Sequence, residues 1–261
     1  MSITRPAIWL LGCIGCVMGC GPRETLPPLD LVQTATEQYG YFPLRVGHYN
    51  VYRIDSTIYD FAGGATAISV ASLFAKEVVA DTFRDLTGVL TYTIERYERL
   101  QPDHPWVLRS VGTAQRTADQ AIRTENNLRF LKLVFPMTRR SEWDGNLWID
   151  PDREIAIADE RMRPFANWRY EVDSIDVRAK AGSFTFDSTL LLTEVNEQSV
   201  VEWRKSRVRY AKNIGVVWRE QYILDSQYCN KVPPPADCAT KPWLEKAERG
   251  YILRQTLIAY Q

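Results

Sequence analysis

The segment Val89-Leu90-Thr91-Tyr92-Thr93-Ile94-Glu95-Arg96-Tyr97 alternates apolar and polar side chains more regularly than any other part of the chain. One face carries Leu90, Tyr92 and Ile94, and the other carries two threonines and a glutamate. Successive side chains of a β-strand point to opposite faces, so this spacing predicts a strand with one buried and one solvated side.

Segments with the same period continue on both sides of this strand, with almost no helical pattern between them. They are residues 48–59, 73–83, 106–114, 120–124, 128–135, 168–177, 184–192, 200–210, 216–224 and 251–260. In the first of them Tyr52, Ile54 and Ile58 share a face, and Gly63-Gly64 predicts the turn that follows. Only residues 31–39 and 243–249 favour short helices.

Short polar connections between these segments favour antiparallel pairing, because parallel strands need crossovers of about a dozen residues or more. One apolar and one polar face per strand favours a sheet that is covered on one side or curled around a core. We therefore expect a mainly β protein, a large antiparallel meander that forms a curved sheet or half-open barrel, with few short helices. A sandwich remains an alternative.

The N-terminal segment has the parts of a bacterial lipoprotein signal. Arg5 precedes an apolar run from Ala7 to Gly19, and Val17-Met18-Gly19-Cys20 fits a lipobox. The run is too short to span a bilayer, which takes about 20 helical residues. An ordinary signal peptide and a buried helix are the alternatives. Leu10-Leu11-Gly12-Cys13 also fits the pattern but leaves a much shorter apolar core, so Cys20 is preferred.

This interpretation predicts residues 1–19 as a signal peptide, 20–40 as a Pro-rich tether and 41–261 as a single antiparallel β domain. Cys20 would carry palmitate-type acyl chains, and more than one chain anchors a protein stably. Gly21 is not the aspartate that retains lipoproteins at the inner membrane in the best-known sorting system. We therefore expect the cell envelope, at the outer rather than the inner membrane, with the body facing the periplasm or the cell surface.

The composition excludes one class of partner. The chain holds 32 basic and 32 acidic residues, and removing the signal removes Arg5 alone among the charged residues. A nearly neutral protein lacks the excess of positive charge with which nucleic-acid-binding proteins neutralise phosphates, so we do not expect nucleic acid as a partner. With 45% hydrophobic residues the chain can bury a sizeable core.

The cysteines reduce to one pair once the signal is removed. Cys13 and Cys16 leave with it, Cys20 is lipidated, and Cys229 and Cys238 remain. A pair of cysteines in an oxidising compartment predicts a disulfide. Zinc is the alternative, but two thiols supply half of a tetrahedral site.

No motif of a known catalytic or nucleotide-binding site is present, so we name no catalytic residue, metal ligand or cofactor. The two histidines, His48 and His104, are too few for a three-histidine metal site, and His104 reads as a loop residue. Oxygen ligands for calcium occur in one acidic stretch, but their order does not match a calcium-binding loop, and a polar loop is preferred. They are Asp144, Asn146, Asp150 and Asp152.

Aromatic and aliphatic side chains leave room for a ligand-binding interior. Most tryptophans are expected in the core or at its rim rather than in a ligand box: Trp106, Trp143, Trp148, Trp168, Trp203 and Trp218. A curved sheet lined by the apolar residues of one segment could still enclose an apolar cavity. These are Leu128, Phe130, Leu131, Leu133 and Phe135.

Three patches carry a resemblance to a family. Tyr210 to Glu220 (YAKNIGVVWRE) resembles the recurrent strand-turn-strand of uncharacterised secreted bacterial lipoproteins. Tyr41-Phe42-Pro43-Leu44 with Gly47 to Tyr52 is similar to their start, and Trp143-Asp144-Gly145-Asn146 to a central element. Asn213 stands where glycine is usual, which asparagine tolerates because it accepts left-handed backbone angles. The resemblance implies a curved half-barrel like that of Lol-type lipoprotein carriers, and no chemistry.

The sequence thus predicts a membrane-anchored envelope lipoprotein with a non-enzymatic β body that binds an apolar ligand or a partner protein. An envelope hydrolase acting on glycan is one alternative, since two carboxylates held across a sugar would suffice. A structural or assembly lipoprotein is the other, with a flat exposed apolar patch as its signature.

Overall fold

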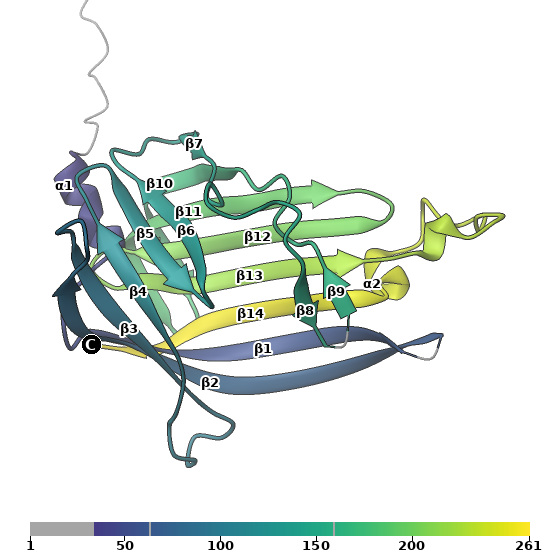
Figure 1. Ribbon diagram of the computed structural model, residues 1–261, viewed down its shortest axis with the longest axis horizontal. Coiled ribbons are helices and arrows are strands. Elements are labelled where there is room, and N and C mark those ends of the chain that lie inside the picture. Colours follow the sequence, from purple (N-terminus) through teal and green to yellow (C-terminus); the bar gives the residue numbers. More distant parts are fainter. Residues whose placement is uncertain (1–33, 63, 159) are drawn as a thin grey trace, which may run out of the picture. The chain divides into compact units, whose positions relative to one another are not determined.

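The structure is a computed structural model that describes residues 34–261, apart from residues 63 and 159. Within this part of the chain, twelve strands form one antiparallel sheet that curls until it nearly closes into a barrel (Figure 1). The strand order is β6-β5-β4-β3-β2-β1-β14-β13-β12-β11-β10-β7. The prediction of a mainly β, antiparallel meander is confirmed, and the half-open barrel is the form that it takes.

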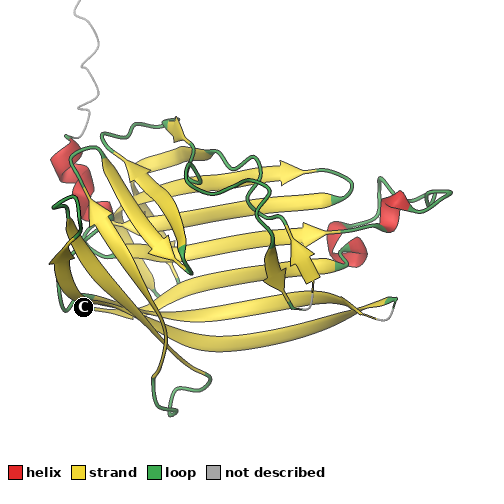
Figure 2. Cartoon of the chain, viewed as in Figure 1, coloured by secondary structure: helices red, strands yellow, loops and turns green. Residues whose placement is uncertain are grey.

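The strands are long, and the helices are single turns (Figure 2). The sheet comprises β1 (Tyr49–Ala62), β2 (Ala65–Arg84), β3 (Leu90–Arg99), β4 (Val107–Arg116), β5 (Gln120–Glu125), β6 (Leu128–Val134), β7 (Glu142–Trp143), β10 (Tyr170–Ala181), β11 (Phe184–Gln198), β12 (Glu202–Ala211), β13 (Gly215–Asp225) and β14 (Arg249–Tyr260). A separate hairpin joins β8 (Ile155–Ile157) to β9 (Glu160–Met162). The helices are α1 (Ala35–Gln38), α2 (Trp243–Lys246) and the 3-10 turns η1 (Tyr39–Tyr41) and η2 (Tyr228–Asn230).

All eleven expected strands are present, and the differences are local. β2 begins at Ala65 rather than at residue 73, because Ala65–Leu73 pairs along its length with β1. β7, β8 and β9 were not expected, since two or three residues are too short to show a period. The helical turn expected from Trp243 is α2, and the one expected before Tyr39 is α1 as far as the described residues show.

The sheet is organised so that its centre joins strands from opposite ends of the described chain. β1 pairs with β14, and the two edges, β6 and β7, are close neighbours in sequence. The edges meet through Leu131, whose backbone N donates to Gly145 O at 2.9 Å and whose O accepts from Trp143 Nε1 at 3.0 Å. We call this contact the seam, and it is what brings the barrel close to closure.

The largest apolar cluster lies on the inner face of the sheet. Its fully buried members include Leu133, Tyr170, Leu190, Leu192 and Val208, which come from strands on both sides of the seam. Burying such side chains contributes roughly 1.5–3 kcal/mol each, so this core holds the two halves of the sheet together. Its members cover the inner face from β10 to β13 and from β3 to β6.

The Tyr210–Glu220 patch of family resemblance contains a tight turn that packs against Gly40. Lys212, Asn213 and Ile214 form the turn between β12 and β13, and Asn213 has a left-handed φ of 67°, as the sequence suggested. Asn213 N donates to Gly40 O at 2.6 Å. A Cβ on Gly40 would lie 2.7 Å from Lys212 Cγ, so the close approach of the two segments requires glycine.

Candidate functional site

A cavity of about 470 Å³ lies on the inner face, between the β1–β5 side of the barrel and β13–β14. Two resemblance patches border it. Phe42 and Leu44 come from the first, and Ile214 and Val216 from the second. The patches are tied together where Asn50 Nδ2 donates to Ile214 O at 2.8 Å. The volume falls within the range of small-molecule sites, about 300–1,000 Å³.

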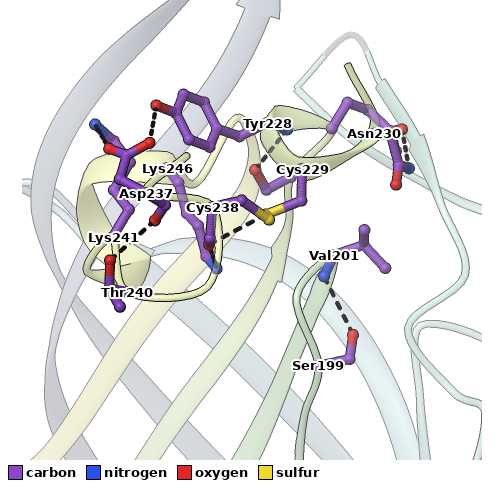
Figure 3. The surroundings of a disulfide bond; sticks show 12 residues. Ser199, Val201, Tyr228, Cys229, Asn230, Asp237, Cys238, Thr240, Lys241 and Lys246 are labelled. Carbon is purple, nitrogen blue, oxygen red and sulfur yellow. Dashed lines mark hydrogen bonds and ion pairs between the residues drawn. A yellow bond between two sulfur atoms is a disulfide. The ribbon is translucent and has the colours of Figure 1, made fainter. Parts of the chain in front are cut away.

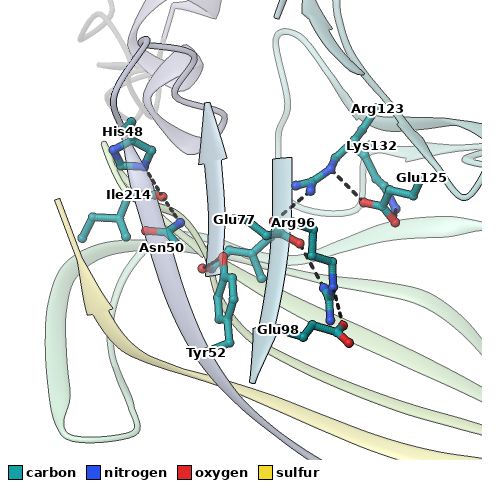
Figure 4. Close-up of polar contacts among 11 residues, drawn as sticks. His48, Asn50, Tyr52, Glu77, Arg96, Glu98, Arg123, Glu125, Lys132 and Ile214 are labelled. Atoms are coloured by element: carbon teal, nitrogen blue, oxygen red, sulfur yellow. Dashed lines mark hydrogen bonds and ion pairs between the residues drawn. The ribbon is translucent and has the colours of Figure 1, made fainter. Parts of the chain in front are cut away.

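The cavity wall carries a network of ion pairs (Figure 4). Glu77 on β2 accepts from Arg96 on β3 at 3.1 Å and from Arg123 on β5 at 2.8 Å. Arg96 also donates to Glu98 at 2.9 Å. Each of these carboxylates therefore has an arginine partner, and the network links the strands across the inside of the curve.

A second part of the network surrounds Glu125. Lys132 Nζ lies 3.5 Å from its Oε2, and Arg123 Nε lies 3.1 Å from its Oε1. The second contact has the distance of an ion pair but not the angle of a hydrogen bond, because Arg123 Nε has no hydrogen-bond partner among the described residues. Only 5% of the Lys132 side chain is exposed, and the ring of Phe130 lies 4.1 Å from its ammonium group.

These surroundings keep the carboxylates ionised. Burial raises the pKa of Glu77, but Arg123 and Arg96 outweigh it, so that the pKa is lowered. The pKa of Glu125 is likewise lowered because Lys132 and Arg123 outweigh its burial. Burial also lowers the pKa of Lys132, and Glu125 offsets only part of that effect. The cavity therefore contains fixed charges of both signs.

Arg219 differs from the other cations of the wall. It lies on β13, its side chain is 15% exposed, and it donates no hydrogen bond to any residue that the structure describes. Its nearest carboxylate is Glu194, with Nη2 and Oε1 3.8 Å apart. Glu194 is fully buried and accepts from Ser206 Oγ through its other oxygen. Burial lowers the pKa of Arg219, but Glu194 and Glu125 raise it more, so that the guanidinium stays charged.

The apolar part of the wall does not come from the segment that the sequence suggested. Phe42, Leu44, Val79, Ile94 and Leu253 line it. The candidate lining residues on and next to β6 are instead packed into protein: Leu131, Leu133 and Phe135 belong to the inner core, and Phe130 is buried. Lys132 is the residue of β6 that reaches the cavity among those described. The expectation of a cavity lined by β6 is therefore wrong.

The other candidate residues from the sequence lie apart from one another. His48 Nε2 is 3.1 Å from Ile214 O at the cavity wall, and His104 is exposed in a turn. Asp144 accepts from Asn146 N at 2.8 Å and Asp150 from Asp152 N at 2.9 Å, so both aspartates shape local turns. The described residues contain no group of three or more His, Cys, Asp or Glu that could hold a metal ion. None of the six tryptophans considered is among the described residues that line the cavity.

Cys229 and Cys238 form a disulfide in the loop between β13 and β14, with Cα atoms 5.2 Å apart (Figure 3). Tyr228 Oη donates to Asp237 Oδ1 at 2.8 Å beside it, and the loop reaches α2, where Lys246 Nζ donates to Cys238 O at 3.3 Å. The described residues of this loop include none that lines the cavity.

Cys20 and the segments predicted as signal peptide and as most of the tether lie outside the described residues. In the part of the chain that is described, no helix combines the length and hydropathy needed to cross a membrane.

Comparison with known proteins shows only distant likeness. No profile of a protein family matches the chain, and no curated protein matches its sequence significantly. Among solved structures, a suspected exported protein with a YmcC-like fold from Bacteroides fragilis is 10% identical, with a TM-score of 0.35. A suspected lipoprotein from Parabacteroides distasonis is 13% identical, with a TM-score of 0.30. Each alignment covers 85% of this chain and 98% of the other. Likeness this weak assigns neither a family nor a function.

The sequence reasoning missed the charged interior. Arg96 and Glu98 follow Leu90, Tyr92 and Ile94 in the same phase of β3, so they occupy the face that was expected to be apolar. Two charged residues in the apolar phase of a strand were therefore the one sign of a charged interior that the sequence offered. Charges on a buried face need partners, and the partners of Arg96 are Glu98 on its own strand and Glu77 on the neighbouring strand β2.

Proposed function

We propose that the protein is an envelope lipoprotein, tethered through Cys20, whose β body binds a small ligand with an apolar portion in the inner cavity. The observation that carries the proposal is the cavity of about 470 Å³, which is walled by apolar side chains on one part and by fixed charges on another. Concave sites of this volume, with apolar walls and convergent polar groups that orient a ligand, are the usual location of small ligands. The tether rests on the lipobox at Val17-Met18-Gly19-Cys20.

A glycan hydrolase is less well supported. Glu77, Glu98 and Glu125 do converge on the cavity, but each forms an ion pair with an arginine or lysine. Glycoside hydrolysis needs a carboxylic acid whose pKa is raised, so that it holds a proton to donate. The pKa values of Glu77 and Glu125 are lowered instead. As ionised carboxylates in ion pairs, these residues are better suited to stabilising the cavity wall and contacting a ligand than to donating a proton.

The proposal is tested by filling the cavity. The neutral fluorescent probe N-phenyl-1-naphthylamine should bind the purified full chain saturably, with one site per protein. Ser110 lines the cavity, so Ser110→Trp should abolish the saturable signal. Leu108→Trp is the matched control, because Leu108 lies on the same strand, is 48% exposed and is not a lining residue. Equal binding by the wild type and Ser110→Trp would contradict the proposal.

Self-association is a second candidate, favoured by one exposed strand edge. β3 pairs with β2 only from Phe74 onward, so Ala65–Leu73 is paired on its β1 side alone (Figure 1). This edge segment contains no charged residue or proline, and Ile68 and Val70 are 58% and 77% exposed. Natural edges usually carry charges or proline that prevent further pairing.

We propose a second copy of the chain as the occupant of this edge, because an uncharged segment can pair with itself without like-charge contacts. Light scattering after size exclusion should show a concentration-dependent dimer. Val70→Lys should abolish it, whereas Val46→Lys, another exposed valine away from the edge, should not. A monomer at all concentrations would exclude this role.

A further inference from the structure

The charges that line the cavity do not balance. Among the described residues, five cationic side chains line it, and three carboxylates do. The cations are Arg96, Arg109, Arg123, Lys132 and Arg219, and the carboxylates are Glu77, Glu98 and Glu125. Glu194 lies behind the wall and offsets one more charge. One positive charge therefore remains uncompensated in a partly desolvated site, where charges interact more strongly than in water.

Arg219 is the buried cation at which a charge is available, because Arg109, which also lies 3.8 Å from its nearest carboxylate, is 60% exposed and therefore solvated. Arg96 and Arg123 both donate to carboxylates at hydrogen-bond distance, whereas Arg219 lies 3.8 Å from its nearest carboxylate. Its buried Nε has no hydrogen-bond partner among the described residues. A guanidinium presents planar pairs of N–H donors that match the two oxygens of a carboxylate.

The neighbours of Arg219 add a polar group and an apolar floor. In the register of the sheet, Ile54, Gln255 and Arg219 lie side by side on β1, β14 and β13, and all three line the cavity. Gln255 is 6% exposed, and its side-chain amide forms no hydrogen bond with another described residue. Leu253, two residues before Gln255 on β14, also lines the cavity, so Ile54 and Leu253 give an apolar floor beside the two polar side chains.

We infer that Arg219, with Gln255 beside it, binds the carboxylate of an amphipathic monoanion whose apolar chain lies along the aliphatic side chains of the wall, Ile54 and Leu253 first. This inference rests on the proposed function, because it identifies the class of ligand for the same cavity. A singly charged head group fits because it neutralises the one excess positive charge. The aliphatic side chains Val79 and Ile94 lie on the β2–β3 wall.

The test compares ligands that share a chain and differ in head group. Octanoate, 1-octanol and octylamine each compete with N-phenyl-1-naphthylamine for the full-length wild type at neutral pH. The apolar wall alone favours octanol, since it has no charge to desolvate. We expect octanoate to displace the probe at least about tenfold more tightly than octanol, and octylamine to be the weakest.

Variants of Arg219 test whether this residue causes the preference for octanoate over octanol. Arg219→Gln should bring octanoate to parity with octanol, and Arg219→Lys should keep part of the preference because the charge remains. Arg53→Gln is the control, since Arg53 is an exposed arginine that does not line the cavity. Because Arg219→Gln leaves Glu194 without its cation, Glu194→Gln/Arg219→Gln is the second variant if the single one does not fold.

The outcomes separate the two proposals. Equal displacement by octanoate and octanol in the wild type, or a preference that persists in Arg219→Gln, overturns the carboxylate site while leaving ligand binding intact. A probe signal that is absent, or that Ser110→Trp does not change, overturns the cavity as a ligand site altogether.

Discussion

Arg123 on β5 donates a hydrogen bond of 2.8 Å to Glu77 on β2, although β3 and β4 lie between them in the sheet. In a flat sheet three strand spacings amount to about 14 Å. The contact therefore depends on the strong curl of the sheet, and it links strands that share no backbone hydrogen bonds.

Breaking this pair should destabilise the body. Arg123→Met leaves Glu77 with one arginine partner in place of two, and we expect a loss of about 3 kcal/mol in the free energy of unfolding. Replacing both residues, as Arg123→Met/Glu77→Leu, should recover part of that loss, because no charge is then left without its partner. Urea denaturation measures both. Arg53→Met, at an exposed ion pair with Asp55, is the control and should cost less than about 1 kcal/mol.

Stability should fall in acid. The pKa of Glu125 is lowered in the folded protein because Lys132 and Arg123 outweigh its burial. A group whose folded pKa is lowered stabilises above its unfolded pKa, about 4.3 for glutamate, and loses that contribution as the pH falls below it. The melting temperature should therefore decrease steeply below about pH 4. Glu125→Gln should flatten this decrease, whereas Glu245→Gln, at an exposed position, should not. An unchanged slope in Glu125→Gln would contradict the assignment.

The disulfide should matter for stability and not for ligand binding. Residues 229–238 form a short closed loop, and the loop-entropy relation gives a contribution of roughly 2.5–3 kcal/mol. We expect Cys229→Ser/Cys238→Ser, or reduction of the wild type, to lower the melting temperature. Binding of the fluorescent probe should be unchanged, because no residue of this loop lines the cavity. Two free thiols in protein exported by a bacterium would show that the bond does not form.

The seam should be sensitive to a single methyl group. A Cβ on Gly145 would lie 2.3 Å from the ring of Tyr170, which is fully buried. Gly145→Ala should therefore cost about 1–3 kcal/mol and increase hydrogen exchange at the amide of Leu131. Tyr170→Leu in the same chain should relieve part of the clash. If Gly145→Ala alone is neutral, the two edges are not held together as described.

Lipidation of Cys20 has a direct test. Intact mass and membrane fractionation after expression in a bacterium should show a wild type that begins at Cys20 with added acyl mass and sediments with membranes. Cys20→Ala should be unmodified and should not sediment. Cys13→Ala is the matched control and should behave as the wild type. Soluble, unprocessed wild type would exclude the anchor and, with it, the envelope assignment.

The long strands could be predicted because their alternation is a local property. Tyr92 and Ile94 pack into the inner core, as the alternation of β3 indicates, whereas Leu90 at the start of the strand is 41% exposed. The same rule has no information on segments such as β7, where Trp143 pairs with Tyr170, because two residues have no period and their pairing depends on the rest of the sheet. How far the sheet closes could not be predicted for the same reason, because closure depends on the seam between β6 and β7.

The cavity was harder to predict because its residues depend on contacts distant in sequence. Glu77 and Arg123 are 46 residues apart, and Arg219 approaches Glu194 only through the pairing of β11, β12 and β13. From the sequence alone these residues belong to polar faces. The apolar residues of β6 were expected at the cavity, yet Leu131 and Leu133 belong to the large inner core, which residues from both ends of the sheet build.

The pairing of β1 with β14 has a consequence for biosynthesis. β1 and β13 are both complete before β14 is made, yet β14 is the strand that joins them, through ten residue pairs on one side and eight on the other. Until it arrives, two half-sheets with open edges have to coexist. The protein should therefore be prone to aggregation at that stage, and variants that weaken β14 should aggregate as they fold.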